Sequence, residues 1–342
     1  MKAAFCTGPL TFEVRDVAQP TPGSTEAVVR VRSCGICGSD LHAFHGSMPP
    51  LPVCPGHEVS GEVVAVGGSP SHVRPGDRVA VEPCPGCREC WCCRSGNYQL
   101  CRNFRSLGMT EDGGFAEYVR VPLHALYPLP AGIDFEIGSL AEPLAVGVHA
   151  VRLGNIHAGD RVAVLGAGSI GLLTVAAAKA AGATEVWVTA RHPHQRAAAE
   201  LLGASRVFSG PDAGTALRDA ASQEWVDTVI ETVGGTADTV DEAVDIVRPA
   251  GSVIVLGVFT TKPSFNALAL MMKEVRITGS MTYNRPGPQA DFDVALQLLA
   301  AEPERYRRLI THRFPLEQIT QGFEAAADKR SGSIKVSIRP AD

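Results

Sequence analysis

No cysteine follows Cys101 in this chain of 342 residues, although ten cysteines precede or occupy that position. Disulfide frameworks are typical of small secreted domains, and this chain is not small. Clustered cysteines in a reducing compartment favour a metal site instead. The uneven distribution also indicates that two parts of the chain do different work, and the length by itself favours two domains.

The chain also lacks a charge excess and a long apolar segment. It carries 31 basic and 36 acidic residues, a net charge of −5, which gives no basis for a nucleic-acid or membrane-surface partner. The longest uncharged apolar run, between Arg161 and Lys179, is slightly short for a membrane span and is interrupted by glycine. The opening MKAAFCTGPL has no sustained apolar core of a signal peptide. We therefore expect a cytoplasmic protein.

The composition and sequence pattern of the chain change between its first and second parts. Residues 1–150 are rich in Gly, Pro, Val and Cys, and short alternating runs such as 27–33 and 60–67 predict an irregular, β-rich domain. From about residue 160, strands such as 185–190 alternate with helical segments about six times, which predicts a doubly wound parallel sheet over 151–284. Residues 285–342 combine a helix with short strands, like the first part of the chain. The sequence thus predicts an α/β chain whose first domain is completed by its C-terminal segment.

Five cysteines lie in CPGCRECWCC (84–93), and Cys101 is a sixth. Four of the six have the spacing C-x2-C-x2-C-x7-C: Cys87, Cys90, Cys93 and Cys101. The short gaps let thiolates converge on one ion, and the longer gap closes the loop. A register starting at Cys84 would put the fourth ligand at Tyr98, so Cys84 and Cys92 are surplus. Four thiolates predict a closed, structural zinc site; buried free cysteines or an iron–sulfur cluster are the alternatives.

A second, mixed set of metal ligands precedes this cluster. GICGSDLH (35–42) and PGHEVSG (55–61) contain Cys37, His42, His57 and Glu58. One thiolate, one imidazole and a carboxylate or water suit a catalytic zinc that keeps an exchangeable position. A single histidine is more often structural than a ligand. The neighbouring Cys–Ser–His group and the cysteine cluster favour the metal site here.

A glycine-rich turn, LGAGSIG (165–171), supplies Gly166, Gly168 and Gly171 as G-x-G-x-x-G. The motif follows a predicted strand and begins a predicted helix, which is the context that dinucleotide binding requires. The first two glycines let the backbone turn and approach a pyrophosphate, and the third lets the helix pack on the strand. Ser169 and Ile170, in the same turn, join the candidate site. The alternative is a set of glycines that serves helix packing alone.

Several segments, in this order, resemble the zinc-dependent medium-chain dehydrogenases over essentially the whole chain: GHEVSGEVVAVG (56–67), the cysteine spacing, DGGFAEY (112–118), EPLAVGVHA (142–150) and the glycine turn. EPLAVGVHA and THRFPLE (311–317) are most similar to the sorbitol, polyol and threonine dehydrogenase branch. The simple alcohol dehydrogenases usually have Cys where this chain has Glu142. The resemblance implies a GroES-like catalytic domain, a Rossmann domain, and a homodimer or homotetramer.

The resemblance also implies ligands for the catalytic zinc. Cys37 and His57 would bind the metal, and Glu58 would bind directly or exchange with water. Glu142 occupies the third-ligand position and would bind zinc or hold a zinc-bound water. The sequence leaves these two carboxylate roles open.

Three further residues receive roles by the same resemblance. Ser39 lies where the family has its proton-relay hydroxyl, and His42 lies where the relay passes the proton to solvent. Asp40 would fix a ligand imidazole. The alternative for Ser39 and Asp40 is an ordinary turn or helix cap.

The second strand of the parallel sheet bears on the cofactor. It ends in VWVTARHPHQR (186–196), where Ala190 aligns with the family's NAD-binding Asp and Arg191 follows. Alanine makes room for a 2′-phosphate, and guanidinium pairs with it, with Arg196 as a further donor. We expect NADP, with NAD as the alternative if Arg191 is a solvated charge.

The expected activity is hydride transfer between a secondary alcohol (a polyol, sugar or cyclitol) and NADP, with two zinc ions per chain. Phe44 and MTYNRP (281–286) are expected to line the substrate cleft, and Thr282 stands where sorbitol enzymes have Arg, which disfavours sorbitol itself. A threonine-type dehydrogenase using NAD and a non-catalytic zinc-stabilised nucleotide-binding protein are the alternatives. The predicted edge strand 277–281 could pair with a second copy of the chain.

Overall fold

The computed structural model describes residues 1–47, 52–68 and 70–340. The chain forms two compact units, Met1–Glu142 with Asn284–Asp342, and Pro143–Tyr283. The chain passes from the first unit to the second between Glu142 and Pro143, in helix α4 (Ala141–Leu153). The same helix contains the boundary expected at residue 150. Among the described residues, no helix combines the length and hydropathy needed to cross a membrane.

The first unit is built on a seven-stranded sheet with the order β14-β15-β3-β4-β5-β7, to which β6 adds by pairing with β3. Its strands are β3 (Glu26–Gly35), β4 (Glu58–Val66), β5 (Arg78–Val81), β6 (Tyr118–Pro122), β7 (Leu126–Pro128), β14 (Ile310–Pro315) and β15 (Lys335–Arg339). A separate hairpin consists of β1 (Lys2–Gly8) and β2 (Thr11–Asp16). Its helices are α1 (Gly38–Phe44), α2 (Trp91–Arg94), α3 (Phe135–Ser139), α10 (Asp291–Ala301), α11 (Pro303–Arg307) and α12 (Ile319–Ala327).

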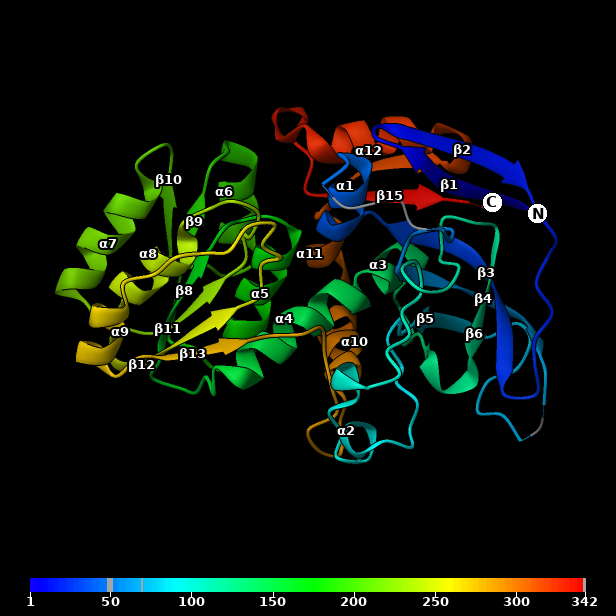
Figure 1. Cartoon of the computed structure of the whole chain (residues 1–342), viewed down its shortest axis with the longest axis horizontal. Helices are drawn as coiled ribbons and strands as arrows, with labels where there is room; N and C mark the ends of the chain where they lie inside the picture. Colours follow the sequence, from blue (N-terminus) through cyan, green and yellow to red (C-terminus); the bar gives the residue numbers. More distant parts are fainter. Residues whose placement is uncertain (48–51, 69, 341–342) are drawn as a thin grey trace. The chain divides into compact units, whose positions relative to one another are not determined.

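The C-terminal strand β15 completes this sheet next to the strands that come first in the chain. It runs antiparallel to β3, pairing Ser337 with Gly35, and β3 in turn pairs Gly35 with Glu58 at the start of β4. Figure 1 shows β15 in red within the same unit as β3 and β4 in blue. This register brings the beginnings of β4 and β15 together beside the end of β3.

Phe44 belongs to the core of this unit. It is 1% exposed, and its ring lies 5.9 Å from that of Phe12 and 5.1 Å from that of Phe323, measured between centroids. The expectation that Phe44 lines a substrate cleft is therefore wrong. The aromatic side of the short helix α1 packs inward, and the polar side carries the candidate site residues.

The second unit is a six-stranded parallel sheet with the order β10-β9-β8-β11-β12-β13. Its strands are β8 (Arg161–Leu165), β9 (Glu185–Ala190), β10 (Arg206–Ser209), β11 (Val226–Glu231), β12 (Val247–Val255) and β13 (Arg276–Gly279). Its helices are α5 (Ser169–Ala180), α6 (Pro193–Leu201), α7 (Ala213–Gln223), α8 (Thr239–Ile246) and α9 (Ala267–Lys273).

The connections of this sheet confirm the predicted doubly wound fold. From β8 the chain moves outward through α5 and α6, then returns to the middle and moves the other way through α8 and α9. Right-handed crossovers place these two groups of helices on opposite faces (Figure 1). The strand order reverses between β8 and β11, and ligands of such sheets bind at the carboxyl ends of the strands at this reversal.

Candidate active site and nucleotide site

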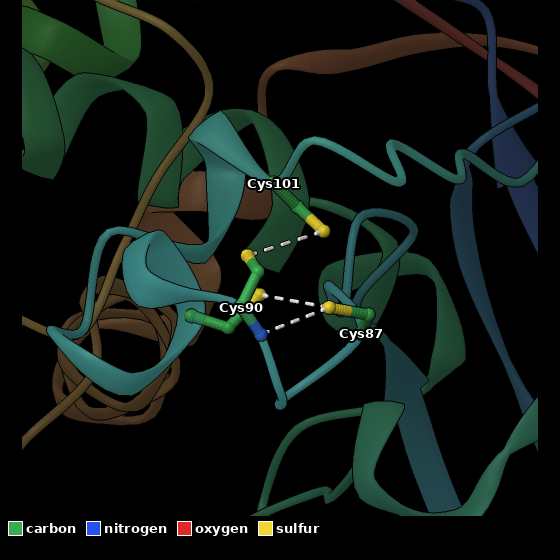
Figure 2. A group of neighbouring side chains, drawn as sticks. Cys87, Cys90 and Cys101 are labelled. Carbon is green, nitrogen blue, oxygen red and sulfur yellow. Dashed lines mark hydrogen bonds between the residues drawn. The ribbon is translucent and has the colours of Figure 1, made fainter.

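The four cysteines predicted to bind zinc lie together in the segment 84–101, which we call the cysteine lobe. The sulfur atoms of Cys87, Cys90, Cys93 and Cys101 are all within 4.8 Å of one another. Sγ of Cys87 is 3.8 Å from that of Cys93. Sγ of Cys90 is 3.9 Å from that of Cys101, and Figure 2 shows these two residues beside Cys87. A tetrahedral zinc with Zn–S bonds of about 2.3 Å separates its sulfurs by about 3.8 Å. The geometry therefore fits a closed zinc site.

Backbone amides in the same lobe favour thiolates. The amide of Cys90 donates to Sγ of Cys87 over 3.4 Å and lowers the pKa of that thiol. The amide of Cys93 likewise lowers the pKa of Cys90 to about 6. Neither surplus cysteine joins the group: Cys84 is buried and donates to Oγ of Ser106 over 3.4 Å, and Cys92 is half-buried in α2.

A second ligand group forms at the start of α1 and β4. Cys37 precedes α1, His57 precedes β4, and Glu58 is the first residue of β4. One ligand atom from each lies within 4.8 Å of the others. His57 and Glu58 are 8% and 0% exposed. One sulfur, one nitrogen and one carboxylate oxygen suit zinc and leave room for a fourth, exchangeable ligand.

Lys335, the first residue of β15, is a site residue that sequence reasoning missed. Its Nζ donates to both carboxylate oxygens of Glu58, over 2.6 and 2.7 Å, and to the carbonyl of Ile36 over 3.1 Å. Lys335 is 1% exposed. The absence of a side chain at Gly35 makes room for this pair, because a Cβ there would lie 2.0 Å from Oε2 of Glu58. A lysine between isoleucine and valine in a strand was the signal, but its partner is 277 positions away.

Asp40, on α1, lies close to two of the zinc-ligand candidates, Cys37 and His57. Its Oδ2 accepts from the amide of Cys37 over 3.0 Å, and its Oδ1 is 3.7 Å from Nδ1 of His57. That ring nitrogen is buried without a hydrogen-bond partner among the described residues. Burial opposes a charged ring, but Asp40 and Cys37 outweigh it, and the pKa of His57 lies well above its ordinary value. Surroundings that favour an added proton also favour a metal cation that displaces it.

The remaining predicted residues surround this group without joining it. Glu142, at the start of α4, is 6% exposed, and burial raises its pKa to about 7. It acts electrostatically on His57 but is not one of the three residues that cluster within 4.8 Å. Ser39 and His42 lie three positions apart on α1, which places them on one face of the helix. In the described part of the chain no hydrogen bond joins their side chains.

The glycine turn lies between β8 and α5, at the sheet's reversal point. Gly166 has φ +99°, a left-handed conformation that favours glycine. A Cβ on Gly171 would lie 2.0 Å from the carbonyl oxygen of Gly166, so the third glycine permits close helix–strand packing. Among the described residues, apart from Gly168 and its two chain neighbours, no atom lies within 4 Å of a Cβ built on Gly168. Ser169 and Ile170 begin α5 at this open position, which fits the approach of a pyrophosphate.

Ala190 and Arg191 occupy the carboxyl end of β9 as the sequence predicts. Ala190 is buried, whereas Arg191 is exposed and has no ion-pair partner among the described residues. Oε1 of Gln195 accepts from the backbone amides of Arg191 and His192, over 3.1 Å each, and fixes this turn. Arg196 is half-exposed and pairs with Glu200 over 2.9 Å. Arg191 is therefore the freer of the two predicted phosphate donors.

Comparisons with known proteins identify the family of the chain. The family described as "Alcohol dehydrogenase GroES-like domain" matches residues 23–131, and "Zinc-binding dehydrogenase" matches residues 169–301. L-galactonate-5-dehydrogenase of Escherichia coli K12 is 33% identical over 331 residues, covering 95% of this chain and 94% of that protein. Human sorbitol dehydrogenase is 32% identical over 345 residues, covering 98% and 95%.

A solved structure is similar over almost the full length. The crystal structure of a zinc-binding dehydrogenase from Sinorhizobium meliloti 1021 bound to NADP has a TM-score of 0.89 and 36% identity, and the match covers 99% of each chain. These matches confirm the family, the two-domain fold class and the enzymatic character expected from the motifs. The chain belongs to the zinc-dependent medium-chain dehydrogenase/reductase superfamily, in its sorbitol dehydrogenase-like branch, and is an NAD(P)-dependent alcohol dehydrogenase.

Proposed function

We propose that the protein oxidises a secondary alcohol of a polyhydroxy compound (a polyol, sugar or cyclitol) to a ketone with NADP, and that each chain holds two zinc ions. The observation that carries this proposal is the Cys37–His57–Glu58 group, in which His57 and Glu58 are buried and Cys37 is partly exposed. It supplies three ligand types at one point and leaves a coordination position free for a substrate hydroxyl. The cysteine lobe, with four thiolates, is the second and purely structural zinc site.

Bound zinc would polarise the substrate hydroxyl and ease its deprotonation, and the nicotinamide cofactor would take the hydride. The carboxylate of Asp40, 3.7 Å from Nδ1 of His57, would favour the orientation of the ring electrostatically. Lys335 holds both oxygens of Glu58, which fixes the carboxylate near the metal position. Ser39 would take the substrate's hydroxyl proton while it passes its own hydroxyl proton towards His42, and His42 would release a proton to solvent.

The preference for NADP rests on the end of β9. Ala190 supplies no carboxylate that would repel a 2′-phosphate, and the unpaired Arg191 supplies a guanidinium that binds phosphate with two parallel hydrogen bonds. The relative from Sinorhizobium meliloti was crystallised with NADP, which supports the same cofactor here.

The substrate class rests on the branch and on the carboxylates around the metal position. Relatives in this branch include dehydrogenases of sorbitol and of L-galactonate, a polyol and a sugar acid. We place Glu142 beside the bound substrate or its water, because it is buried near His57 but outside the ligand group. Within the segment 281–286, which was expected to line the substrate cleft, Tyr283 is fully buried. The side chain of this tyrosine therefore presents no surface to a substrate.

The test is a panel of polyols, cyclitols, simple secondary alcohols and L-threonine, each with NAD and with NADP. Turnover confined to polyhydroxy substrates, with higher kcat/KM for NADP, supports the proposal. An Ala190→Asp variant should reverse the cofactor preference, whereas Arg94→Ala, an exposed arginine in the cysteine lobe, should leave it unchanged. A wild-type preference for NAD, or for L-threonine, contradicts it.

We further propose a homodimer formed through the edge of the parallel sheet. Strand β13 is the last strand on one side, and the preceding helix α9 has no buried residue. Large apolar side chains in this region are 42–73% exposed: Val258, Phe265, Leu268, Met271, Met272 and Met281. An unpaired strand edge beside an apolar surface suits pairing with a second copy. Light scattering should give twice the chain mass, and a monomer for Leu268→Glu with Met272→Glu; a monomeric wild type contradicts the proposal.

A further inference from the structure

Glu231, the last residue of β11, is a fully buried carboxylate with one unpaired oxygen. Its Oε1 accepts from the amides of Val233 and Gly234, over 2.7 and 2.9 Å, and from Oγ1 of Thr239 over 2.8 Å. Its Oε2 is buried and has no hydrogen-bond partner among the described residues. Three hydrogen bonds donated to one carboxyl oxygen are an arrangement that suits a negative charge on that group.

Two loops hold this charge in place. The amides of Leu256 and Gly257, which follow β12, donate to the carbonyl of Glu231 over 2.9 and 3.1 Å. A Cβ on Gly257 would lie 2.5 Å from Oε2 of Glu231, so only glycine fits there without displacing the carboxylate. Gly234, in the loop after β11, has φ +63°. The carboxylate is therefore enclosed by the loops that leave the carboxyl ends of β11 and β12.

These loops belong to the half of the sheet that faces the nicotinamide. In a doubly wound nucleotide-binding sheet, the adenosine half of the dinucleotide lies over the first three strands, here β8, β9 and β10, and the pyrophosphate lies at the glycine turn. The strands β11, β12 and β13 are left for the nicotinamide half. Thr232, the residue after Glu231, donates to the carbonyls of Leu165 and Gly166 over 2.7 and 3.3 Å, so the end of β11 lies beside the glycine turn.

The oxidised nicotinamide ring carries a positive charge that disappears when the ring accepts a hydride. A fixed negative charge in a water-free position stabilises the first form more than the second. We propose that Glu231 biases the nucleotide site towards the oxidised cofactor and so sets the balance between the two redox forms of bound cofactor. This inference rests on the proposed function, because it requires that the site hold a nicotinamide dinucleotide.

The size of the effect follows from charge separation. For unit charges on the order of 10 Å apart, at an effective dielectric constant of about 20, Coulomb's law gives roughly a tenfold change in the ratio of dissociation constants. Because the carboxylate is fully buried, added salt should screen this effect only weakly.

The experiment measures Kd for the oxidised and for the reduced cofactor, by calorimetry or by reduced-cofactor fluorescence, without substrate. In Glu231→Gln the ratio of oxidised to reduced Kd should rise about tenfold. Thr239→Val removes one hydrogen bond and keeps the charge, so its ratio should match the wild type even where both Kd values increase. Glu231→Met is the second charge-free variant and is measured if Glu231→Gln does not fold.

The outcomes separate this inference from the proposed function. Wild-type protein that binds cofactor, with the same Kd ratio in Glu231→Gln, overturns the role of Glu231 and leaves the dehydrogenase intact. An equal change of ratio in Thr239→Val shows that loop geometry acts instead of charge, and also overturns it. Wild-type protein that binds neither NADP nor NAD overturns both.

Discussion

At the scale of single residues, the buried Lys335–Glu58 pair is the contact on which the metal region depends most. Replacing Lys335 by Met leaves the Glu58 carboxylate buried without a counter-charge. Loss of one partner of a buried ion pair costs about 3–5 kcal/mol. Lys335→Met should therefore lower the free energy of unfolding by about that amount in urea titrations.

A double variant provides the control for this prediction. Glu58→Gln combined with Lys335→Met removes both charges, so it should be more stable than Lys335→Met alone. If the losses of unfolding free energy in Lys335→Met and Glu58→Gln add up to the loss in the double variant, the two residues are not coupled, contrary to the geometry.

Glu82 gives the molecule a pH dependence that can be tested apart from the metal site. Burial raises the pKa of this carboxyl to about 7, although Tyr98, Tyr127, Arg285 and Arg88 act in the opposite direction. Between the ordinary pKa of about 4.5 and 7 the folded chain binds a proton that the unfolded chain has lost, so stability falls as pH rises through this window.

Glu82→Gln should abolish this loss. Its free energy of unfolding, relative to the wild type, should rise by up to about 3 kcal/mol between pH 5 and pH 8. Urea titrations at each pH measure the difference. A difference that stays constant across this range would show that Glu82 ionises equally in both states.

At the scale of elements, the cysteine lobe has little regular structure to maintain its fold. Helix α2 has four residues, none of them buried, and the following 3-10 turn, Tyr98–Leu100, has three. We infer that the metal holds residues 84–101 together. Cys93→Ser should lose one zinc per chain and become sensitive to proteolysis within the lobe, whereas Cys92→Ser should retain the metal and the resistance. Equal behaviour of the two variants would remove Cys93 from the ligand set.

Elements were also the level at which sequence reasoning worked best. The alternation of apolar runs and helical segments predicted the parallel sheet, and the bounds of β9 coincide with the predicted strand 185–190. Local spacing was sufficient because each lobe cysteine lies within a few positions of the next. The packing of α1 was not predictable this way, because the partners of Phe44 are Phe12 and Phe323, at opposite ends of the chain.

At the scale of the whole molecule, the candidate site combines segments that only the fold brings together. Cys37 and His57 were identified from their motifs, but Lys335 was not, because nothing in SIKVSI (333–338) indicates a partner 277 positions earlier. Glu231 was missed for a related reason. A glutamate at the end of a strand reads as an ordinary polar terminus until the loops of two strands are seen to close around it.

We propose that Cys37, His57 and Glu58 form the catalytic zinc site, separate from the cysteine lobe. The most direct test of this proposal counts zinc per chain in the wild type and in Cys37→Ser, with turnover measured on the same samples. We expect two zinc ions in the wild type and one in Cys37→Ser, with turnover in the variant lower by about 10²–10⁴-fold, as for a lost catalytic group. One zinc in an active wild type, or full turnover in Cys37→Ser, would contradict it.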